Sequence, residues 1–570
     1  MDRRTVWAIL LMMAIAITPA IFMKRPPKTG GAAATQPAQP APQQPAATAP
    51  ARTDSAVGRP ADTVLAGGPV PTRADTVHVT SPLYTYGIST AGGRLVEARL
   101  ERYRSNAPAD NHALAQIVAP DSKLLDMTLV LGSDTIPLGD WRFTPSTDSL
   151  NVSADGAPLR LTASQGPVSV DLTYTFRPDD YQIAVSGHVS GVGPNGGQLF
   201  LAMGPTLANT EANAEENHHA LALVTKHNEA DRTDFSSLKP GEPRTISGPL
   251  EWAAIKSKYF VTAILAFDST GGGISGVTAT ARQTDEKRPT SADVRLSMPL
   301  APSGNFAYSV YAGPMEYDRL GRVGHDFDDV NPYGWPGVRT IIRPVAGAVR
   351  WLLVWMHDHL SLPYGLVLIF FGIMVRVLLW PLNQKAMRAN LQLQAVQPLM
   401  KEIQDKYKSD PPRLQQEMFK LYKEHSVNPL GGCWPMLLPM PVLFALFFVF
   451  QNTIELRGAS FLWLPDLSRP DPYYIIPLIM GLSMFGLSKV GQMGMEPNPQ
   501  MKMMLYVMPA MMTFLFLNFA SGLNLYYAIS NIASIPQQWM LARERLKRTA
   551  RAIVEVKTEK PPAGGKRKKA

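Results

Sequence analysis

Arg376 is the residue with the clearest chemical consequence, because it stands inside an apolar stretch. The stretch runs from Tyr364 to Trp380 and contains no other charged residue. A run of this length fits the hydrocarbon core of a bilayer, which is about 30 Å thick. A guanidinium costs roughly 2.5–3.5 kcal/mol at the centre of a membrane helix and does not lose its proton there. Arg376 is therefore expected to reach the headgroups, to find a partner or to face a water-filled cavity.

The sequence leaves two of these outcomes open. Arg376 lies near the end of the run, roughly 9 Å of helix before Leu382 at 1.5 Å per residue, so its side chain can reach lipid headgroups. A hydrated cavity would instead give the cation a function, which is to hold a polar or anionic segment within the membrane.

Composition divides the chain into two unlike halves. The first is polar and rich in Thr, Ser, Gly, Asp and Pro, and the second contains long apolar runs and most of the 26 methionines. The single cysteine, Cys433, excludes an intramolecular disulfide framework and a Cys-based zinc site. The net charge of +9 gathers beside the apolar runs and at the C-terminus. This distribution indicates membrane topology or contact with anionic lipid, and no specific reading of nucleic acid.

The N-terminal region predicts an anchor followed by a tether. An apolar run at residues 5–23 follows Arg3 and Arg4, and Lys24 and Arg25 follow it directly. We predict an uncleaved transmembrane anchor at residues 1–25, although cleavage as a signal peptide stays open. Residues 26–75 are rich in Pro and Ala and are predicted to be a disordered linker.

Residues 76–315 predict an all-β sandwich. Short alternating segments such as Val168–Phe176 are separated by turns such as Gly271-Gly272-Gly273. His218 and His219 are adjacent, so on a regular element they would point apart, and we interpret them as loop residues rather than metal ligands. A carbohydrate enzyme would need paired carboxylates, and Glu211, Glu215 and Glu216 are candidates by residue type alone.

Residues 336–362 predict an amphipathic helix. Apolar residues recur there at helical spacing, with Arg339, Arg343 and Arg350 among them. We expect the helix to lie at the membrane interface, and packing on the β domain is the alternative.

Residues 363–540 predict a polytopic α-helical membrane core. The expected transmembrane helices are at about 364–382, 430–450, 473–490, 504–518 and 519–539, which with the anchor make six. Lys and Arg gather in alternate loops and in the basic tail at 541–570. The positive-inside rule then places both termini in the cytoplasm and the β domain outside.

Residues 384–427 predict a cytoplasmic helical hairpin. Apolar stripes suggest two antiparallel helices, with a turn at Ser409–Pro412 and a kink at Pro398. The stripes either pair only with each other or also contact a partner. The basic residues that we assign to this hairpin are Lys385, Arg388, Lys401, Lys406 and Lys420.

Several stretches together resemble one family. Tyr422–Pro435, Pro472–Phe485 and Ser521–Asn531, with Val375-Arg376 and Trp380–Leu382, are similar to the YidC-type membrane protein insertases of bacterial inner membranes. These insertases form the YidC/Oxa/Alb family, and the resemblance is to its Gram-negative type with a large periplasmic domain. The β domain agrees more weakly, through Trp252 and Lys258–Ala263.

The resemblance implies a five-helix core with a hydrophilic groove open to lipid, in which the groove arginine receives polar parts of a client. The client-groove residues that the resemblance implies, or that polarity suggests in the case of Asn518, are Arg376, Tyr526, Tyr527, Asn518 and Met484. The resemblance further implies an inner-membrane insertase and folding chaperone that acts alone or with the Sec translocon. The hairpin would recruit nascent clients and the tail would contact the ribosome. The β domain would be a supersandwich similar to sugar-mutarotase folds, dispensable for insertion.

The chain departs from the family pattern at three positions. Gly372 replaces a frequent threonine, Pro439 a frequent glutamine, and Asn518 a frequent aromatic residue. The groove must therefore be lined differently, and spacing alone does not show by which side chains.

The remaining function classes are less well supported. A secondary transporter with Arg376 as counter-ion would be expected to show internal repeats, and the core spans show none. The sequence contains no Walker motif and no metal or cofactor signature, so we expect no cofactor and no enzymatic activity.

Overall fold

The computed structural model describes residues 75–154, 156–266, 273–282, 288–334, 338–381, 383–384, 396–425, 440–494 and 499–558. The predicted anchor, the linker before Asp75, and Pro439, Lys385 and Arg388 lie outside these ranges. The chain divides into two units after Asp75, and the rest of the described residues belong to the second unit, Thr76–Ala570.

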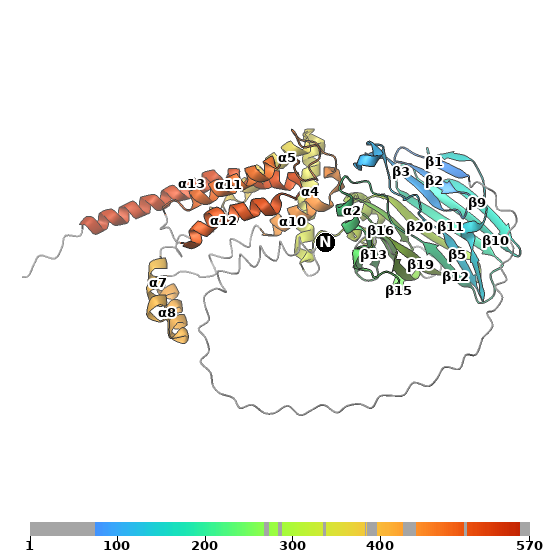
Figure 1. The fold of residues 1–570 in the computed structure, drawn as a ribbon, viewed down its shortest axis with the longest axis horizontal. Coiled ribbons are helices and arrows are strands. Elements are labelled where there is room, and N and C mark those ends of the chain that lie inside the picture. Colours follow the sequence, from blue (N-terminus) through green and yellow to red (C-terminus); the bar gives the residue numbers. More distant parts are fainter. Residues whose placement is uncertain are drawn as a thin grey trace, which may run out of the picture. The chain divides into compact units, whose positions relative to one another are not determined.

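Three sheets make up the β domain, and the strands of each sheet are named in the order in which they lie side by side. The first sheet contains β4 (Leu114–Gln116), β3 (Leu95–Arg104), β2 (Tyr84–Ser89), β1 (Thr76–Thr80) and β8 (Ser149–Asn151). The second contains β14 (Ala230–Asp234), β13 (Ala222–Lys226), β16 (Trp252–Lys256), β17 (Phe260–Leu265), β20 (Asn305–Pro314), β11 (Gln182–Ser190), β10 (Val168–Phe176), β9 (Ala157–Gln165) and β7 (Thr144–Pro145). The third contains β15 (Arg244–Leu250), β18 (Ile274–Ala281), β19 (Ala292–Leu300), β12 (Gly197–Ala202), β5 (Met127–Leu131) and β6 (Asp134–Pro137). Figure 1 labels strands from each of the three sheets.

The alternating sequence pattern explains why these segments are strands. In β10 the apolar residues Val168, Val170 and Leu172 are buried, while the residues between them are half-buried or exposed. Val170 pairs with Val189 of β11, so both strands direct apolar side chains to the same core. The predicted β-rich domain is confirmed.

One local interpretation was wrong. His218 and His219 lie in a short helix, α2 (Ala214–Ala220), and not in a loop. The Asn213 side chain accepts a hydrogen bond from the Glu216 amide at 3.2 Å, which caps the start of this helix. Within the described ranges, no group of three or more His, Cys, Asp or Glu residues is placed to hold a metal ion.

The second half of the chain is helical. It contains α4 (Arg339–Leu360), α5 (Tyr364–Leu378), α7 (Gln397–Lys406), α8 (Pro411–Glu424), α10 (Met440–Asn452), α11 (Ile475–Gly491), α12 (Pro499–Phe516) and α13 (Ser521–Thr558). The short helix α3 (Tyr317–Val323) and a 3₁₀ turn at Phe327–Val330 precede α4. None of the helices in the described ranges combines the length and hydropathy needed to cross a membrane, so the predicted count of six spans is not confirmed.

Two helix ends differ from the sequence-based expectation. Pro398 lies in the first turn of α7, where a missing amide hydrogen is tolerated, and so it does not kink a helix interior. The helix α13 continues without a break into the predicted tail and ends at Thr558.

Helix α4 has two kinds of surface. Arg343 pairs with Asp328 at 2.6 Å, and Arg350 pairs with Asp318 and, at 2.8 Å, with Glu455. Trp351 is 61% exposed on the same helix. The polar face therefore contacts the segments around Asp318, Asp328 and Glu455, which lie outside the predicted β domain, while Trp351 stays exposed.

A buried lysine gives the β domain a testable pH dependence. Burial lowers the pKa of Lys256 well below its usual value, and its amine donates a hydrogen bond to Asn331 Oδ1 at 2.7 Å. The unfolded state then binds more protons than the folded state, so stability rises with pH up to about 10.4, the pKa of an unperturbed lysine.

We therefore expect Lys256→Met to stabilise the full chain at pH 7 by about 1–4 kcal/mol, the range of gains seen when buried ionic groups are replaced. The gain should shrink as the pH rises toward 10. Thermal unfolding at pH 7, 8 and 9.5 measures this, with Lys239→Met as the control, since Lys239 is 74% exposed. A gain independent of pH would show that the amine is already charged in the fold.

Candidate functional site

Arg376 occupies the last turn of α5 and is half-buried. Among the described residues, no carboxylate lies within ion-pair distance of its guanidinium, and its Nε atom has no hydrogen-bond partner. A cation in this state needs water or an outside ligand to satisfy its donors.

Helix α5 packs on α13 beside this arginine. The rings of Phe371 and Tyr526 lie 5.9 Å apart. A Cβ atom at Gly372 would lie 3.3 Å from Ile529 Cγ2 and 3.6 Å from Tyr526 Cδ2. Gly372 thus allows the two helices to approach, and a threonine at this position would crowd α13. This close packing accounts for one departure from the family pattern.

Two tyrosines of α13 lie near the cation. Tyr526 is 5% exposed and Tyr527 is half-buried, and their rings are 5.7 Å apart. The Tyr526 ring packs on Phe371, which lies five residues before Arg376 on α5. The Tyr527 ring also meets the edge of Phe516, at the end of α12, at 5.4 Å. The predicted residues Arg376, Tyr526 and Tyr527 are therefore brought together.

The other two groove candidates lie elsewhere. Asn518 is exposed in the connection between α12 and α13. Helix α13 begins at Ser521, roughly 14 Å of helix before Ser530 at 1.5 Å per residue, and Asn518 precedes that start. Met484 is half-buried on α11, a helix that also packs on α13. The structure gives neither residue a contact with Arg376.

Buried polar residues on α13 form a stripe that the sequence reading only partly identified. Asn524 and Ser530 are fully buried, Ser534 is 7% exposed and Gln537 is 4% exposed. Gln537 Nε2 donates to the Trp380 carbonyl at 3.0 Å, and Asn531 Nδ2 donates to Ser483 Oγ on α11 at 3.2 Å. The spacing 530, 534, 537 marks one helical face and was the available signal for Ser534 and Gln537.

The basic hairpin residues are only partly described. Lys406 and Lys420 are exposed on α7 and α8, and Lys406 Nζ lies 5.4 Å from the centre of the Tyr407 ring. Lys401 belongs to α7, but its side chain lies outside the described part, as do Lys385 and Arg388.

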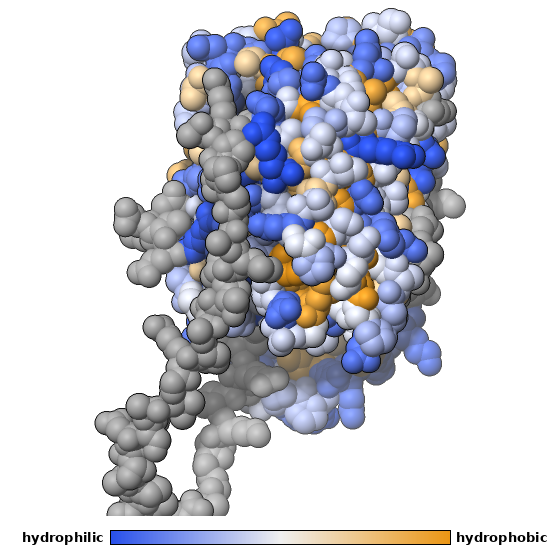
Figure 2. Space-filling view, turned by 90° about the vertical axis from the view of Figure 1, so that its right-hand side faces the viewer, coloured by the Kyte–Doolittle hydropathy of each residue, from blue (hydrophilic) through white to orange (hydrophobic). Residues whose placement is uncertain are grey.

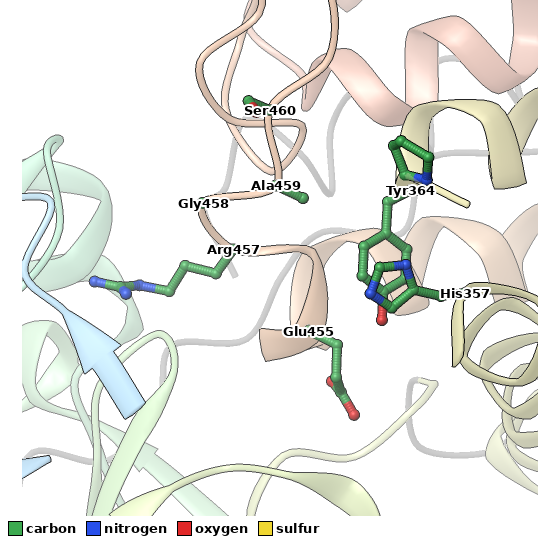
Figure 3. A pocket seen from close by; sticks show the side chains of 8 residues that line it. His357, Tyr364, Glu455, Arg457, Gly458, Ala459 and Ser460 are labelled. Atoms are coloured by element: carbon green, nitrogen blue, oxygen red, sulfur yellow. The ribbon is translucent and has the colours of Figure 1, made fainter. Parts of the chain in front are cut away.

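A pocket lies between the α4–α5 junction and the segment Thr453–Tyr474, which connects α10 to α11 (the α10–α11 segment). Its volume is about 320 Å³, and its lining includes His357, Tyr364, Glu455 and Arg457. Figure 3 shows the rings of His357 and Tyr364 stacked beside it, with the Arg457 side chain extending away. Burial raises the pKa of Glu455, and Arg350 acts in the opposite direction.

Arg457 joins the α10–α11 segment to the β domain. Its Nε atom donates to Glu211 Oε1 at 2.9 Å, and its Nη atoms donate to the carbonyls of Arg104 at 2.7 Å and Thr210 at 2.9 Å. The side chains of Arg457 and Glu211 are 4% and 10% exposed. Ile454 of the same segment belongs to the hydrophobic core of the β domain.

Comparison with known proteins identifies the family. The family model "60Kd inner membrane protein" matches residues 355–549, and the model "YidC periplasmic domain" matches residues 76–346. A protein of Chlorobaculum tepidum named "Membrane protein insertase YidC" is 31% identical in an alignment that covers 100% of both chains. This chain belongs to the YidC family. A YidC of Maridesulfovibrio salexigens is 30% identical over 89% of this chain and 94% of its own length.

Two solved structures share less with the chain. The crystal structure of an active YidC insertase with its first transmembrane domain resolved is 17% identical, with a TM-score of 0.34, and covers 82% of this chain and 93% of that one. A galactose mutarotase-like protein from Lactobacillus casei is 12% identical, with a TM-score of 0.26, and covers 42% of this chain and 99% of that one. The family membership rests on the sequence matches, which extend over both the β domain and the helical part.

Proposed function

We propose that this chain inserts the transmembrane segments of client proteins into the inner membrane through a polar, lipid-open groove beside Arg376. The observation that carries the proposal is a cation without a carboxylate partner in the described residues, placed next to Tyr526 and Tyr527 and the polar stripe of α13. The sequence relatives named as membrane protein insertases support the same function.

The distribution of exposed apolar side chains supports a membrane location for the helical part. Every large hydrophobic residue that is exposed within the described ranges lies at Val338 or beyond, including Val377 at 63%, Leu482 at 70% and Phe514 at 77%. The face of the β domain in Figure 2 is mostly hydrophilic, with hydrophobic residues scattered over it. An apolar surface of this kind indicates contact with lipid or with a partner, whereas the β domain is suited to water.

We propose a multi-pass topology with both termini in the cytoplasm and the β domain in the periplasm. Lys and Arg are frequent in the loops that this topology places inside, and the α10–α11 segment, placed outside, contains only Arg457 and Arg469.

The energetics explain how such a groove can act without nucleotide hydrolysis. Each unpaired peptide group of a client tail loses its water in lipid at a cost of several kcal/mol. A polar groove partway through the membrane shortens that path, and the Arg376 cation attracts acidic tails. Burial of the client's apolar segment, at roughly 25 cal/mol per Å², then favours release into the bilayer.

The proposed function also implies which partners this chain has. Nascent membrane proteins are the clients, and we expect the Sec translocon to share some of them. The exposed lysines of α7 and α8 would recruit clients, and the basic tail would contact the ribosome and anionic lipid. The role is that of an insertase and folding chaperone, not of an enzyme that makes or breaks bonds.

Reconstitution tests the proposal and the role of the β domain together. Vesicles that contain the full chain should insert a short single-span client, and vesicles that contain the chain without Thr76–Gly313 should do so within about twofold. This deletion removes Glu211 and also the domain that covers Arg457, so the arginine becomes hydrated instead of buried and unpaired. Insertion no better than in empty vesicles by the full chain would contradict the function. A loss confined to the deletion, with its helices folded by circular dichroism, would assign the function to the β domain.

A further inference from the structure

Gln537 contacts the chain just after the end of α5, four residues beyond Arg376. The glutamine is 4% exposed, and its Nε2 atom donates to the Trp380 carbonyl at 3.0 Å. Trp380 follows the last residue of α5, Leu378, by two positions. Trp380 is in the helical segment that follows α5, so a side chain of α13 that bonds its carbonyl can hold the chain directly after α5 in place.

A second contact fixes α5 on the other side of Arg376. Gly372 approaches Ile529 so closely that an added Cβ would lie at 3.3 Å. Gly372 of α5 and Trp380, which lies two residues past the end of α5, are eight residues apart, and so are Ile529 and Gln537 of α13. The two segments therefore advance by the same number of residues between these two contacts.

Arg376 stands at the midpoint of this register. It is four residues from both Gly372 and Trp380, and the corresponding midpoint on α13 is Ala533. Ser530 and Ser534, close to Ala533 in the sequence, are buried and polar. A shift of α5 by one residue would move the cation by roughly 1.5 Å along the helix.

We propose that Gln537 is a positioning residue, which sets the depth and direction of the Arg376 cation by holding the end of α5 against α13. This inference rests on the proposed function, because it assigns to Gln537 the preference of the groove for acidic client tails. The neighbouring Gln538 does not share the role, since its Oε1 atom lies near Gly491 of α11, at 3.5 Å from the Cβ position there.

The test compares two glutamines of the full chain in vesicles. Gln537→Met keeps the shape of the side chain and removes its donor, and Gln538→Met is the matched control. Two single-span clients are used, identical except for an acidic or a neutral tail. Gln537→Met should lower insertion of the acidic-tailed client about fivefold, a typical coupling between two sites, and change the neutral-tailed client by less than twofold. Gln538→Met should leave both within twofold.

A double variant separates positioning from general damage. Arg376→Ala with Gln537→Met should insert the acidic-tailed client no worse than Arg376→Ala alone, because Gln537 acts through the arginine. If Gln537→Met folds poorly, Gln537→Asn, which is too short to reach Trp380 in this geometry, replaces it in every arm.

Three results would overturn the inference: wild-type insertion by the Gln537 variant, equal losses for both clients, or additive losses in the double variant. If Arg376→Ala itself inserts the acidic-tailed client normally, the proposed function fails. If only Arg376→Ala is impaired, that function stands and the role of Gln537 falls.

Discussion

Replacing Arg376 with alanine should reduce the insertion of clients with acidic outer tails by roughly ten- to a hundredfold, equivalent to about 1.4–2.7 kcal/mol. Two unit charges 4 Å apart attract by about 4 kcal/mol at an effective dielectric constant of 20, and part of this is offset by the loss of hydration. No carboxylate of the described residues pairs with this cation. Its charge is therefore available to a client rather than consumed inside the protein.

The measurement is the yield of protease-protected client in vesicles that contain equal amounts of folded wild type or variant. Arg376→Lys keeps the charge without the planar fork of donors, and should fall between wild type and alanine. Arg543→Ala is the matched control, since Arg543 is exposed and lies 3.6 Å from the centre of the Trp539 ring. Equal yields from wild type and Arg376→Ala would remove the arginine from the mechanism.

Replacing Glu211 with alanine should destabilise the attachment of the β domain by about 3–5 kcal/mol, the usual cost of removing one partner of a buried ion pair. The Arg457 side chain is 4% exposed, so it would stay buried while it loses its negatively charged partner. The carbonyls of Arg104 and Thr210 would remain as acceptors and limit the loss to the lower part of that range. Because the pair is buried, salt should change this cost little.

Hydrogen exchange reports this change at the amides of the α10–α11 segment, with thermal unfolding as the global measure. The Leu456, Arg457 and Leu467 amides bond within the segment, to Thr453, Ile454 and Ala459, so they should exchange faster once the segment leaves the β domain. Asp293→Ala provides the control, because Asp293 and its partner Arg282 are 53% and 32% exposed. That exposed pair should contribute less than about 1 kcal/mol. Equal effects of the two substitutions would show that the Arg457–Glu211 pair does not stabilise the attachment of the α10–α11 segment to the β domain.

Local patterns explain which features could be predicted from sequence. Alternation in Val168–Phe176 reports a strand because the side-chain period and the burial period are the same. Arg376 could be singled out because a charge within an apolar run is costly at any position along the fold. The assignment of Tyr526 and Tyr527 to one groove with Arg376 comes from the family resemblance and stays a prediction.

Contacts between distant segments could not be predicted. Glu211 and Arg457 are 246 residues apart, and nothing in either neighbourhood encodes the other. Gln537 follows Ser530 at helical spacing, but its partner is a backbone carbonyl, which every residue carries. The polarity of Asn518 suggests a groove residue, yet Asn518 precedes the first residue of α13 and is exposed. Polarity indicates a preference for water, and only the packing of α5 on α13 decides which polar residues surround the cation.

The central claim is that polar client segments come to rest beside the guanidinium. It is tested most directly by photocrosslinking from position 527 in the full chain to a stalled nascent client, with position 514 on the exposed face of α12 as the reference. We expect strong crosslinks from position 527 to the acidic tail of the client, which are lost when Arg376 is also alanine, and crosslinks from position 514 to the apolar segment of the client alone. Acidic-tail crosslinks from position 514 with none from position 527 would contradict it.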